Sequence, residues 1–206
     1  MKIFINYWNA LVCSMSKARL GFALLAGASL IGCASSGSAL QYYLLHSTTS
    51  PSATQYASAP HRLLINKIVL PDYLKQRGLV YQTSSTSLHI ATEHLWAEPL
   101  DEGITKSLKA ALRTQGVMLV THNVNAKDIN DYLTLQIDDF IATWQGDIIL
   151  RGQYIIKHTN DSQSANDFEY ILPLSTDGFP ASIEVMREAI NALATDIANN
   201  ISSVQK

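Results

Sequence analysis

A short apolar run near the start of the chain limits which residues can belong to a folded body. The run extends from Leu20 to Ile31, is interrupted only by small residues, and follows the basic residues Lys17 and Arg19. A basic flank followed by a short apolar core is typical of a bacterial export signal. The run is shorter than the ~20 apolar residues that a membrane-spanning helix needs. We therefore expect this segment to direct export and then to be removed.

The run ends in Leu30-Ile31-Gly32-Cys33, which resembles a lipobox, the site at which a bacterial lipoprotein is cleaved and acylated. A buried free cysteine after a core helix is the alternative, but Gly32 and the Ser/Gly-rich residues 35–38 would end such a helix poorly. We therefore predict a signal peptide over residues 1–32 and a diacylglyceryl group and an N-acyl chain on Cys33. Several acyl chains hold a protein at a membrane far more firmly than one.

The residues around this signal add two expectations. Met15–Arg19 forms a complete signal start by itself, so we expect translation to begin at Met15. Residues 34–39 are small and polar, so we predict an acylated tether over residues 33–40. Ala34 follows the acylated cysteine, where an aspartate commonly retains enterobacterial lipoproteins in the inner membrane. We therefore expect a lipid-anchored protein of the outer membrane that faces the periplasm.

Processing before Cys33 would leave 174 of the 206 residues, with 12 basic and 17 acidic side chains. This mildly acidic balance argues against nucleic acid as a partner. The other cysteine, Cys13, would leave with the signal, so no disulfide is expected within the mature chain. The length suits one domain, which we place at residues 41–206 with a Ser/Thr/Ala/Pro-rich flexible loop over 47–60.

Alternating or continuous apolar residues predict most of the strands in this body. They are expected at residues 41–46, 63–70, 79–82, 88–90, 117–120, 133–144, 148–157 and 168–174. Thr159–Asp167 is expected to be a polar hairpin loop. Pro173 lacks a backbone N–H, so the strand that contains it is expected at a sheet edge.

Two segments instead follow the helical period. Apolar residues recur every four positions from Leu100 to Leu112, between Pro99 at the start and Gly116 at the end. A second apolar stripe begins near Pro180 and continues to Ile201. We therefore predict an α/β (α+β) fold, with two main helices packed on a mixed, largely antiparallel sheet.

The sequence offers no catalytic constellation and no convincing metal site. Motifs for a nucleophile elbow, a phosphate-binding loop and a dinucleotide-binding turn are absent. His89, Glu93 and His94 lack the spacing of a metalloprotease motif. Asp138 and Asp139 are adjacent in a predicted strand, so their side chains should point to opposite faces rather than share a proton. We predict no enzyme activity, no metal and no non-covalent cofactor.

Two clusters combine aromatic, proline and charged residues. One lies within residues 70–80 and the other within residues 96–100. Their members are candidates for a partner-binding surface: Pro71, Tyr73, Arg77, Trp96, Glu98 and Pro99. Aromatic residues and arginine dominate protein interfaces. The alternative is that these residues form a strand-end turn and a tryptophan that caps the core.

At these clusters the chain resembles the PqiC/YmbA-type family of ABC-transport auxiliary lipoproteins. The shared features are the lipobox, Tyr42-Tyr43-Leu44, the segment Leu70–Leu74, the segment Trp96–Leu100 and a closing amphipathic helix. The resemblance extends over nearly the whole mature chain. It implies a fold similar to the N-terminal domain of TolB.

The resemblance also implies a function in transport. Members are similar to outer-membrane partners of MCE-domain systems, whose hydrophobic tunnels carry lipid across the periplasm. This chain would then dock an MCE-domain tunnel protein at the outer membrane, as a ring of identical subunits. Two other hypotheses stay open: an envelope-assembly scaffold without lipid cargo, and a periplasmic lipoprotein hydrolase with an unrecognised site.

Overall fold

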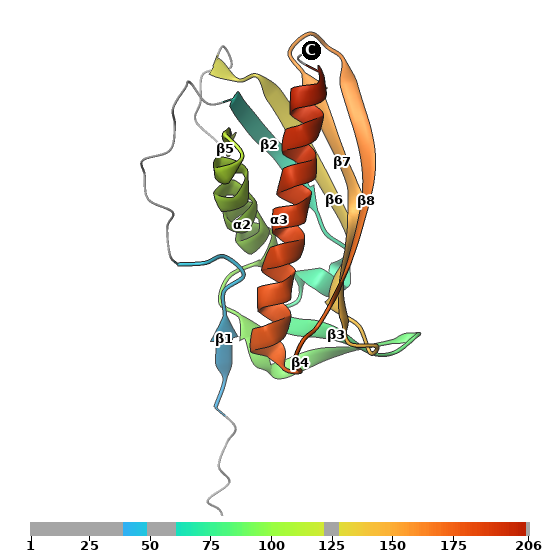
Figure 1. Cartoon of the computed structure of the whole chain (residues 1–206). Helices are drawn as coiled ribbons and strands as arrows, with labels where there is room; N and C mark the ends of the chain where they lie inside the picture. The colour runs from blue at the N-terminus through green and yellow to red at the C-terminus, as the bar shows by residue number, and fades with distance from the viewer. Residues whose placement is uncertain (1–38, 49–60, 122–127, 205–206) are drawn as a thin grey trace, which may run out of the picture. The chain divides into compact units, whose positions relative to one another are not determined.

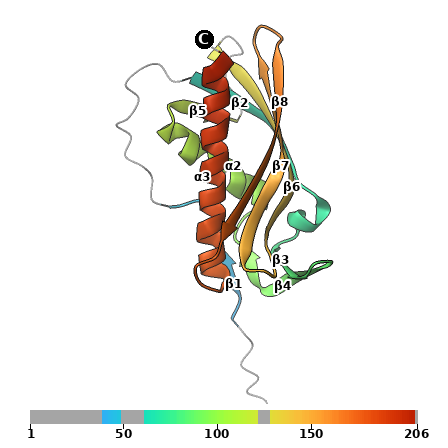
Figure 2. The same ribbon diagram turned by 45° about the vertical axis from the view of Figure 1, so that its right-hand side comes forward.

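The computed structural model describes residues 39–48, 61–121 and 128–204, which fold as a mixed sheet with two helices packed on one face (Figures 1 and 2). The strands are β1 (Gln41–Tyr43), β2 (His61–Val69), β3 (Gly78–Ser84), β4 (Ser87–Trp96), β5 (Val117–Val120), β6 (Asp131–Ala142), β7 (Asp147–His158) and β8 (Gln163–Pro173). The helices are α2 (Leu100–Thr114), α3 (Phe179–Val204) and a 3-10 turn, η2 (Asp72–Lys75). The predicted fold class is confirmed.

Strand β6 organises the sheet because it pairs with three other strands. Its first half, Asp131 to Gln136, is parallel to β2, and its end meets β3 at the pair Tyr81–Ala142. Its other edge carries β7, which pairs with β8; these two antiparallel ladders are the longest in the sheet. Strand β3 continues the sheet into β4 and then β1. Among the strands that the structure describes, β8 pairs only with β7, which confirms the edge position predicted from Pro173.

Helix α2 has the boundaries that its sequence predicts. Pro99 occupies the N-cap, and the positive φ of Gly116 (79°) follows the C-cap residue, Gln115. The side chains of Ile104, Leu108 and Leu112 are fully buried, since their four-residue spacing places them on one face. This face joins α2 to the core of the sheet.

Helix α3 is 26 residues long and lies along the sheet beside α2 (Figure 1). Its predicted apolar stripe is buried, from Ile183 through Ile190 and Ile197 to Ile201. The Tyr170 hydroxyl donates a hydrogen bond to the Asp196 carboxylate and so ties β8 to the helix. No helix within the described ranges is long and apolar enough to cross a membrane. The burial of the stripe places it in the core of the domain.

Several predicted boundaries are wrong. The strand predicted at 88–90 extends over Ser87–Trp96, and the strand predicted to reach residue 144 ends at Ala142. The first strand ends at Tyr43 rather than at residue 46, because the chain turns there and buries Leu45. The Arg187 guanidinium on α3 donates hydrogen bonds to the carbonyl oxygens of Leu44 and Leu45 and so holds this turn. The polar loop predicted at 159–167 is also too long. β7 runs to His158 and β8 begins at Gln163, so polar residues continue the hairpin.

Some predictions fall on residues that the structure does not describe. The signal peptide, its alternative start at Met15, and Cys33 lie outside the described residues, as do all but the last two residues of the tether and most of the loop predicted at 47–60. The domain boundaries therefore remain predictions.

Two glycine-to-alanine substitutions should separate the stability lost through a steric clash from the stability lost through an unfavourable backbone conformation. A Cβ at Gly152 would lie 2.1 Å from the carbonyl oxygen of Gln136 on β6, whereas a Cβ at Gly116 would meet no atom within 4 Å. Gly152→Ala must push β6 and β7 apart, and we expect it to lower the free energy of unfolding by about 3 kcal/mol. Gly116→Ala imposes only the left-handed conformation and should cost about 1 kcal/mol. Chemical denaturation measures both, and a greater loss for Gly116→Ala would contradict this packing.

Candidate functional site

The two sequence clusters meet at one end of the sheet, where β1 begins (Figure 1). Residues 71–77 connect β2 to β3, and residues 97–99 connect β4 to α2. The Trp96 amide donates a hydrogen bond to the Arg77 carbonyl oxygen at 2.8 Å, and the Ala97 amide donates one to the Tyr43 carbonyl oxygen at 2.8 Å. These backbone contacts join the clusters to each other and to β1. We call this region the motif end.

Tyr73 holds the η2 turn against β6. Its hydroxyl shares its one proton between a carboxylate oxygen of Asp139 (2.5 Å) and the Asp138 carbonyl oxygen (2.8 Å). The Asp139 carboxylate also accepts a hydrogen bond from the Arg151 guanidinium on β7. Burial, followed by the hydrogen bond to Asp139, raises the pKa of the Tyr73 phenol above its ordinary value. This tyrosine therefore serves as a neutral donor that connects a turn to the sheet.

The position of Asp139 depends on an irregularity in β6. The register with β7 shifts between Ile137 and Asp139, as in a β-bulge. Asp138 is exposed and accepts a hydrogen bond from the Gln136 side-chain amide, whereas Asp139 binds Tyr73 and Arg151. The neighbouring carboxylates thus have different partners, which agrees with the expectation that they share no proton.

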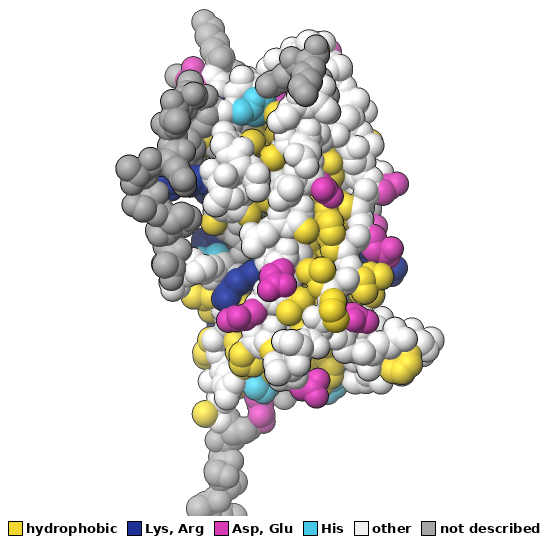
Figure 3. Space-filling view, in the orientation of Figure 1, with side chains coloured by type: hydrophobic (Ala, Val, Ile, Leu, Met, Phe, Trp, Pro, Cys, Tyr) yellow, Lys and Arg dark blue, Asp and Glu magenta, His cyan; other side chains and the backbone are white. Residues whose placement is uncertain are grey.

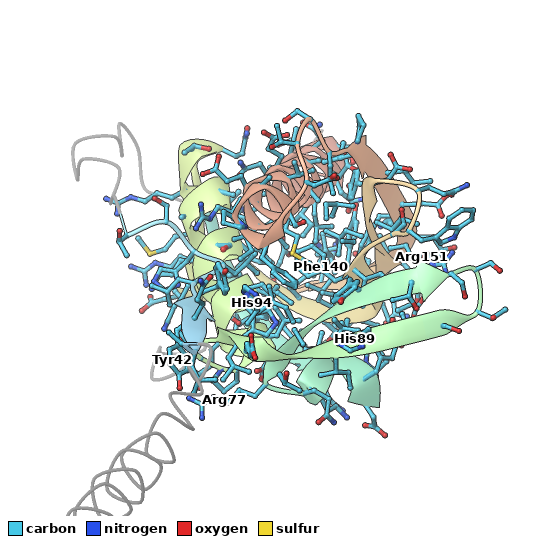
Figure 4. The ribbon with its side chains drawn as sticks, turned by 90° about the horizontal axis from the view of Figure 1, so that it is seen from below. Tyr42, Arg77, His89, His94, Phe140 and Arg151 are labelled. Carbon is cyan, nitrogen blue, oxygen red and sulfur yellow. The ribbon has the colours of Figure 1, made fainter. Side chains whose placement is uncertain are left out.

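Arg77 is exposed and lies over the ring of Tyr42 on β1, with its guanidinium carbon 5.5 Å from the ring centre (Figure 4). Such a cation–π contact at an exposed site is worth about 0.5–1 kcal/mol. Tyr42 itself is 52% exposed, so the pair presents an amphipathic surface beside the start of β1.

Trp96 lies in the core, since its side chain is only 5% exposed. Glu98 accepts hydrogen bonds from His46 (2.8 Å) and Lys106, which ties the chain after β1 to the start of α2. Pro99 is exposed, and Pro71 is half-buried at the N-cap of η2. Of the six candidates, Arg77 and Pro99 are thus accessible to a partner, and Trp96 supports the fold.

Two arrangements at the ends of the sheet could not be found from sequence spacing. At the motif end, the Phe179 ring packs against three rings, those of Tyr43, Tyr81 and His94; the His94 ring centre is 4.1 Å away. At the other end, the buried Asp131 carboxylate binds His61 through one oxygen (2.8 Å) and His158 through the other (2.7 Å). Both arrangements depend on strand pairing between distant residues.

Neither arrangement defines a catalytic or metal centre. Over the described ranges, no group of three or more histidine, cysteine or acidic side chains is placed to hold a metal ion. Both oxygens of Asp131 already accept hydrogen bonds from histidines on other strands. The arrangement at Asp131 therefore fastens β2, β6 and β7 together where β6 begins.

The fold and these junctions define a small α/β domain in which two helices cover one face of a mixed sheet. The chain belongs to the family of ABC-type transport auxiliary lipoprotein components, which it matches over residues 43–198. It is 28% identical over 172 residues to the intermembrane transport lipoprotein PqiC of Escherichia coli (strain K12), covering 84% of this chain and 91% of that protein. The predicted family resemblance is confirmed.

Solved structures agree with the fold. The chain is similar to an uncharacterized protein of known crystal structure, with a TM-score of 0.68 and 25% identity over 79% of this chain and 99% of the other. It is also similar to a protein from Xanthomonas campestris, with a TM-score of 0.59 and 13% identity over 79% of this chain and 99% of the other.

Removal of the Tyr73 hydroxyl tests the junction between η2 and β6. Tyr73→Phe leaves the ring in place but removes both hydrogen bonds, one of them to a carboxylate, so we expect a loss of about 2 kcal/mol in the free energy of unfolding. Tyr42→Phe, at an exposed ring, is the matched control and should change stability by less than about 0.5 kcal/mol. Equal effects of the two variants would contradict the assigned role.

The same variant has a pH signature. The folded state raises the pKa of the Tyr73 phenol above the unfolded value of about 10. The stabilisation is therefore complete below pH ~10 and is lost as the pH rises toward the folded pKa, because only the unfolded state releases the proton in that range. Tyr73→Phe should flatten this decline in stability.

Proposed function

We propose that this protein is the lipid-anchored outer-membrane component of an MCE/ABC-type intermembrane lipid transport system, in which it docks the periplasmic tunnel protein. The observation that carries the proposal is the family match over residues 43–198, combined with the lipobox at Cys33. PqiC, which is similar to this chain over most of its length, is described as an intermembrane transport lipoprotein. The proposal assigns binding and docking to the domain, and no chemical reaction.

The described surface supports docking at the motif end. Arg77 and Tyr42 form an exposed pair, and the exposed Pro99 lies in the connection that hydrogen-bonds to β1. Arginine and tyrosine are common energetic centres of interfaces. Tyr73, Glu98 and the buried Trp96 hold this surface in shape, since each connects a different element to it.

The sheet also offers a surface for contacts between identical subunits. Strand β8 is an edge strand, and Ile171 on it is 54% exposed. Ile171 pairs with Ile149 of β7, so two isoleucines lie side by side on the outer face of the sheet. An apolar strip at an edge supports the proposed ring, because head-to-tail contacts between copies can close into a ring.

The anchor is tested by Cys33→Ser. Without the thiol the precursor cannot receive the diacylglyceryl group, so we expect an uncleaved, unacylated chain. Intact-mass spectrometry of the purified protein measures both changes. Replacement of Ser36 by alanine, in the predicted tether, is the matched control and should leave processing unchanged. A Cys33→Ser protein that is acylated and cleaved normally would contradict the lipobox assignment.

The docking surface is tested by charge reversal. Arg77→Glu removes the cation that lies over Tyr42, and we expect it to reduce the amount of MCE-domain protein that co-purifies while the far-ultraviolet circular dichroism spectrum stays unchanged. Lys157→Glu makes the same charge change near the end of β7, where the β7–β8 turn begins, and should leave co-purification intact. Equal recovery of the MCE-domain protein with both variants would exclude Arg77 from the interface.

A further inference from the structure

A pocket of about 370 Å³ lies at the motif end, between β3, the ends of β4 and β6, and the first turns of α3. We call it the end pocket. Its lining includes Leu79, Trp96, Phe140, Ala142, Phe179 and Met186. Its volume falls within the range of about 300–1,000 Å³ that is usual for small-molecule sites. Figure 4 shows Phe140 next to α3, inward from His94 on β4.

The lining favours an apolar ligand. Trp96, Phe140 and Met186 are at least 95% buried and form an apolar floor. Two of the polar lining side chains have partners within the domain: the Ser182 hydroxyl donates to the Gly178 carbonyl oxygen, and the Thr143 hydroxyl accepts from the Asp147 amide. The other two, Tyr81 and Asp177, are not among the three deeply buried residues of the floor. Small-molecule sites usually present a few free polar groups that fix orientation. A ligand here would instead be recognised by its hydrocarbon surface.

The end pocket is close to the point where the chain leaves for its anchor. Tyr43 of β1 pairs with Trp96, and its ring centre is 6.2 Å from that of Phe179. Cys33 precedes Gln41 by eight residues, which span at most about 29 Å when fully extended. An acylated Cys33 would therefore keep the pocket next to the membrane surface.

Exposed apolar side chains surround the same end of the domain. Leu40, Tyr42 and Trp144 are each more than half exposed, and Trp144 directly follows the lining residue Thr143. Tryptophan and tyrosine are favoured at membrane–water interfaces. On the face drawn in Figure 3, hydrophobic side chains also gather along α3 and toward this end.

We propose that the end pocket binds one acyl chain of a phospholipid from the membrane in which the protein is anchored. This inference rests on the proposed function and extends it, because it assigns the domain a direct contact with the transported class of molecule. The apolar floor accepts the hydrocarbon, and the exposed Asp177 at the pocket lining stays in contact with water near the head group.

The tryptophans provide a direct test. After processing before Cys33, Trp96 and Trp144 are the tryptophans that remain. Trp144→Phe leaves Trp96, which lines the pocket, as the reporter. The acylated Trp144→Phe protein is reconstituted in vesicles of phosphatidylethanolamine and phosphatidylglycerol with brominated acyl chains, since bromine quenches indole fluorescence on contact. We expect a loss of Trp96 emission relative to vesicles with unbrominated lipid.

Filling the pocket should prevent this loss. Ala142→Leu, made in the Trp144→Phe protein, occupies pocket volume and should restore Trp96 emission in brominated vesicles. Ala142→Val fills less and should restore it in part, which keeps the test valid if the leucine variant folds poorly. Ala165→Leu, on the exposed part of β8, is the matched control and should leave quenching unchanged.

Three results would overturn the proposal. If Trp96 emission is equal in both vesicle types, no acyl chain of the bilayer enters the pocket. The pocket would then be filled by the protein's own unbrominated anchor or by a partner's side chain. Quenching that persists unchanged in well-folded Ala142→Leu would come from the bilayer outside the pocket. Equal protection by Ala165→Leu would remove the site specificity. Co-purification with an MCE-domain protein is measured separately, so the proposed function can stand when the pocket fails.

Discussion

The pairing of β6 with three strands is the constraint on which the rest of the domain depends. One edge of β6 accepts β2 and then β3, while the other accepts β7. Its first half buries Leu133, Leu135 and Ile137 fully, and the bulge after Ile137 then changes which side chains face inward. Because of this change, Phe140 enters the core and Asp139 becomes available to Tyr73 and Arg151.

The two ends of β6 serve different purposes. At its start, the buried Asp131 carboxylate joins His61 and His158, so the end farther from β1 is closed by hydrogen bonds between strands. At its end, the sheet widens into β3, β4 and β1, and the end pocket remains between them and α3. Exposed aromatic residues are concentrated at this second end, next to the residue from which the chain continues toward Cys33. The surfaces proposed for partner and lipid therefore lie at the end of the sheet where β1 begins, and the hydrogen-bonded histidines lie at the opposite end.

Sequence periodicity predicted the elements whose pattern is local. The four-residue spacing from Leu100 to Leu112 defines α2, and the stripe through Ile183 and Ile190 defines α3, because one buried helical face dictates both patterns. The hairpin of β7 and β8 was predicted too short because its far end carries polar residues on an exposed ladder, where alternation of apolar residues disappears. The first strand was predicted too long for the opposite reason, since Leu45 is apolar but belongs to the core rather than to the strand.

The candidate site could be predicted only in part. The two clusters were found because their aromatic, proline and charged residues are unusual in composition, and they do meet in space. Composition does not show burial, so Trp96 and Arg77 looked alike in sequence although one lies in the core and the other is exposed. The ring cluster at Phe179 and the end pocket depend on contacts between residues far apart in the sequence, such as Tyr43 with Phe179 and Leu79 with Met186. No local sequence pattern encodes such contacts.

The proposed function is docking of the tunnel protein of an intermembrane transport system at the outer membrane. The most direct measurement is purification of the acylated protein in mild detergent from separated inner and outer membranes, with mass spectrometry of everything that co-purifies. We expect an MCE-domain protein in the outer-membrane fraction, together with an oligomer of this chain. A monodisperse monomer that is recovered alone, or only from the inner membrane, would contradict the proposed docking.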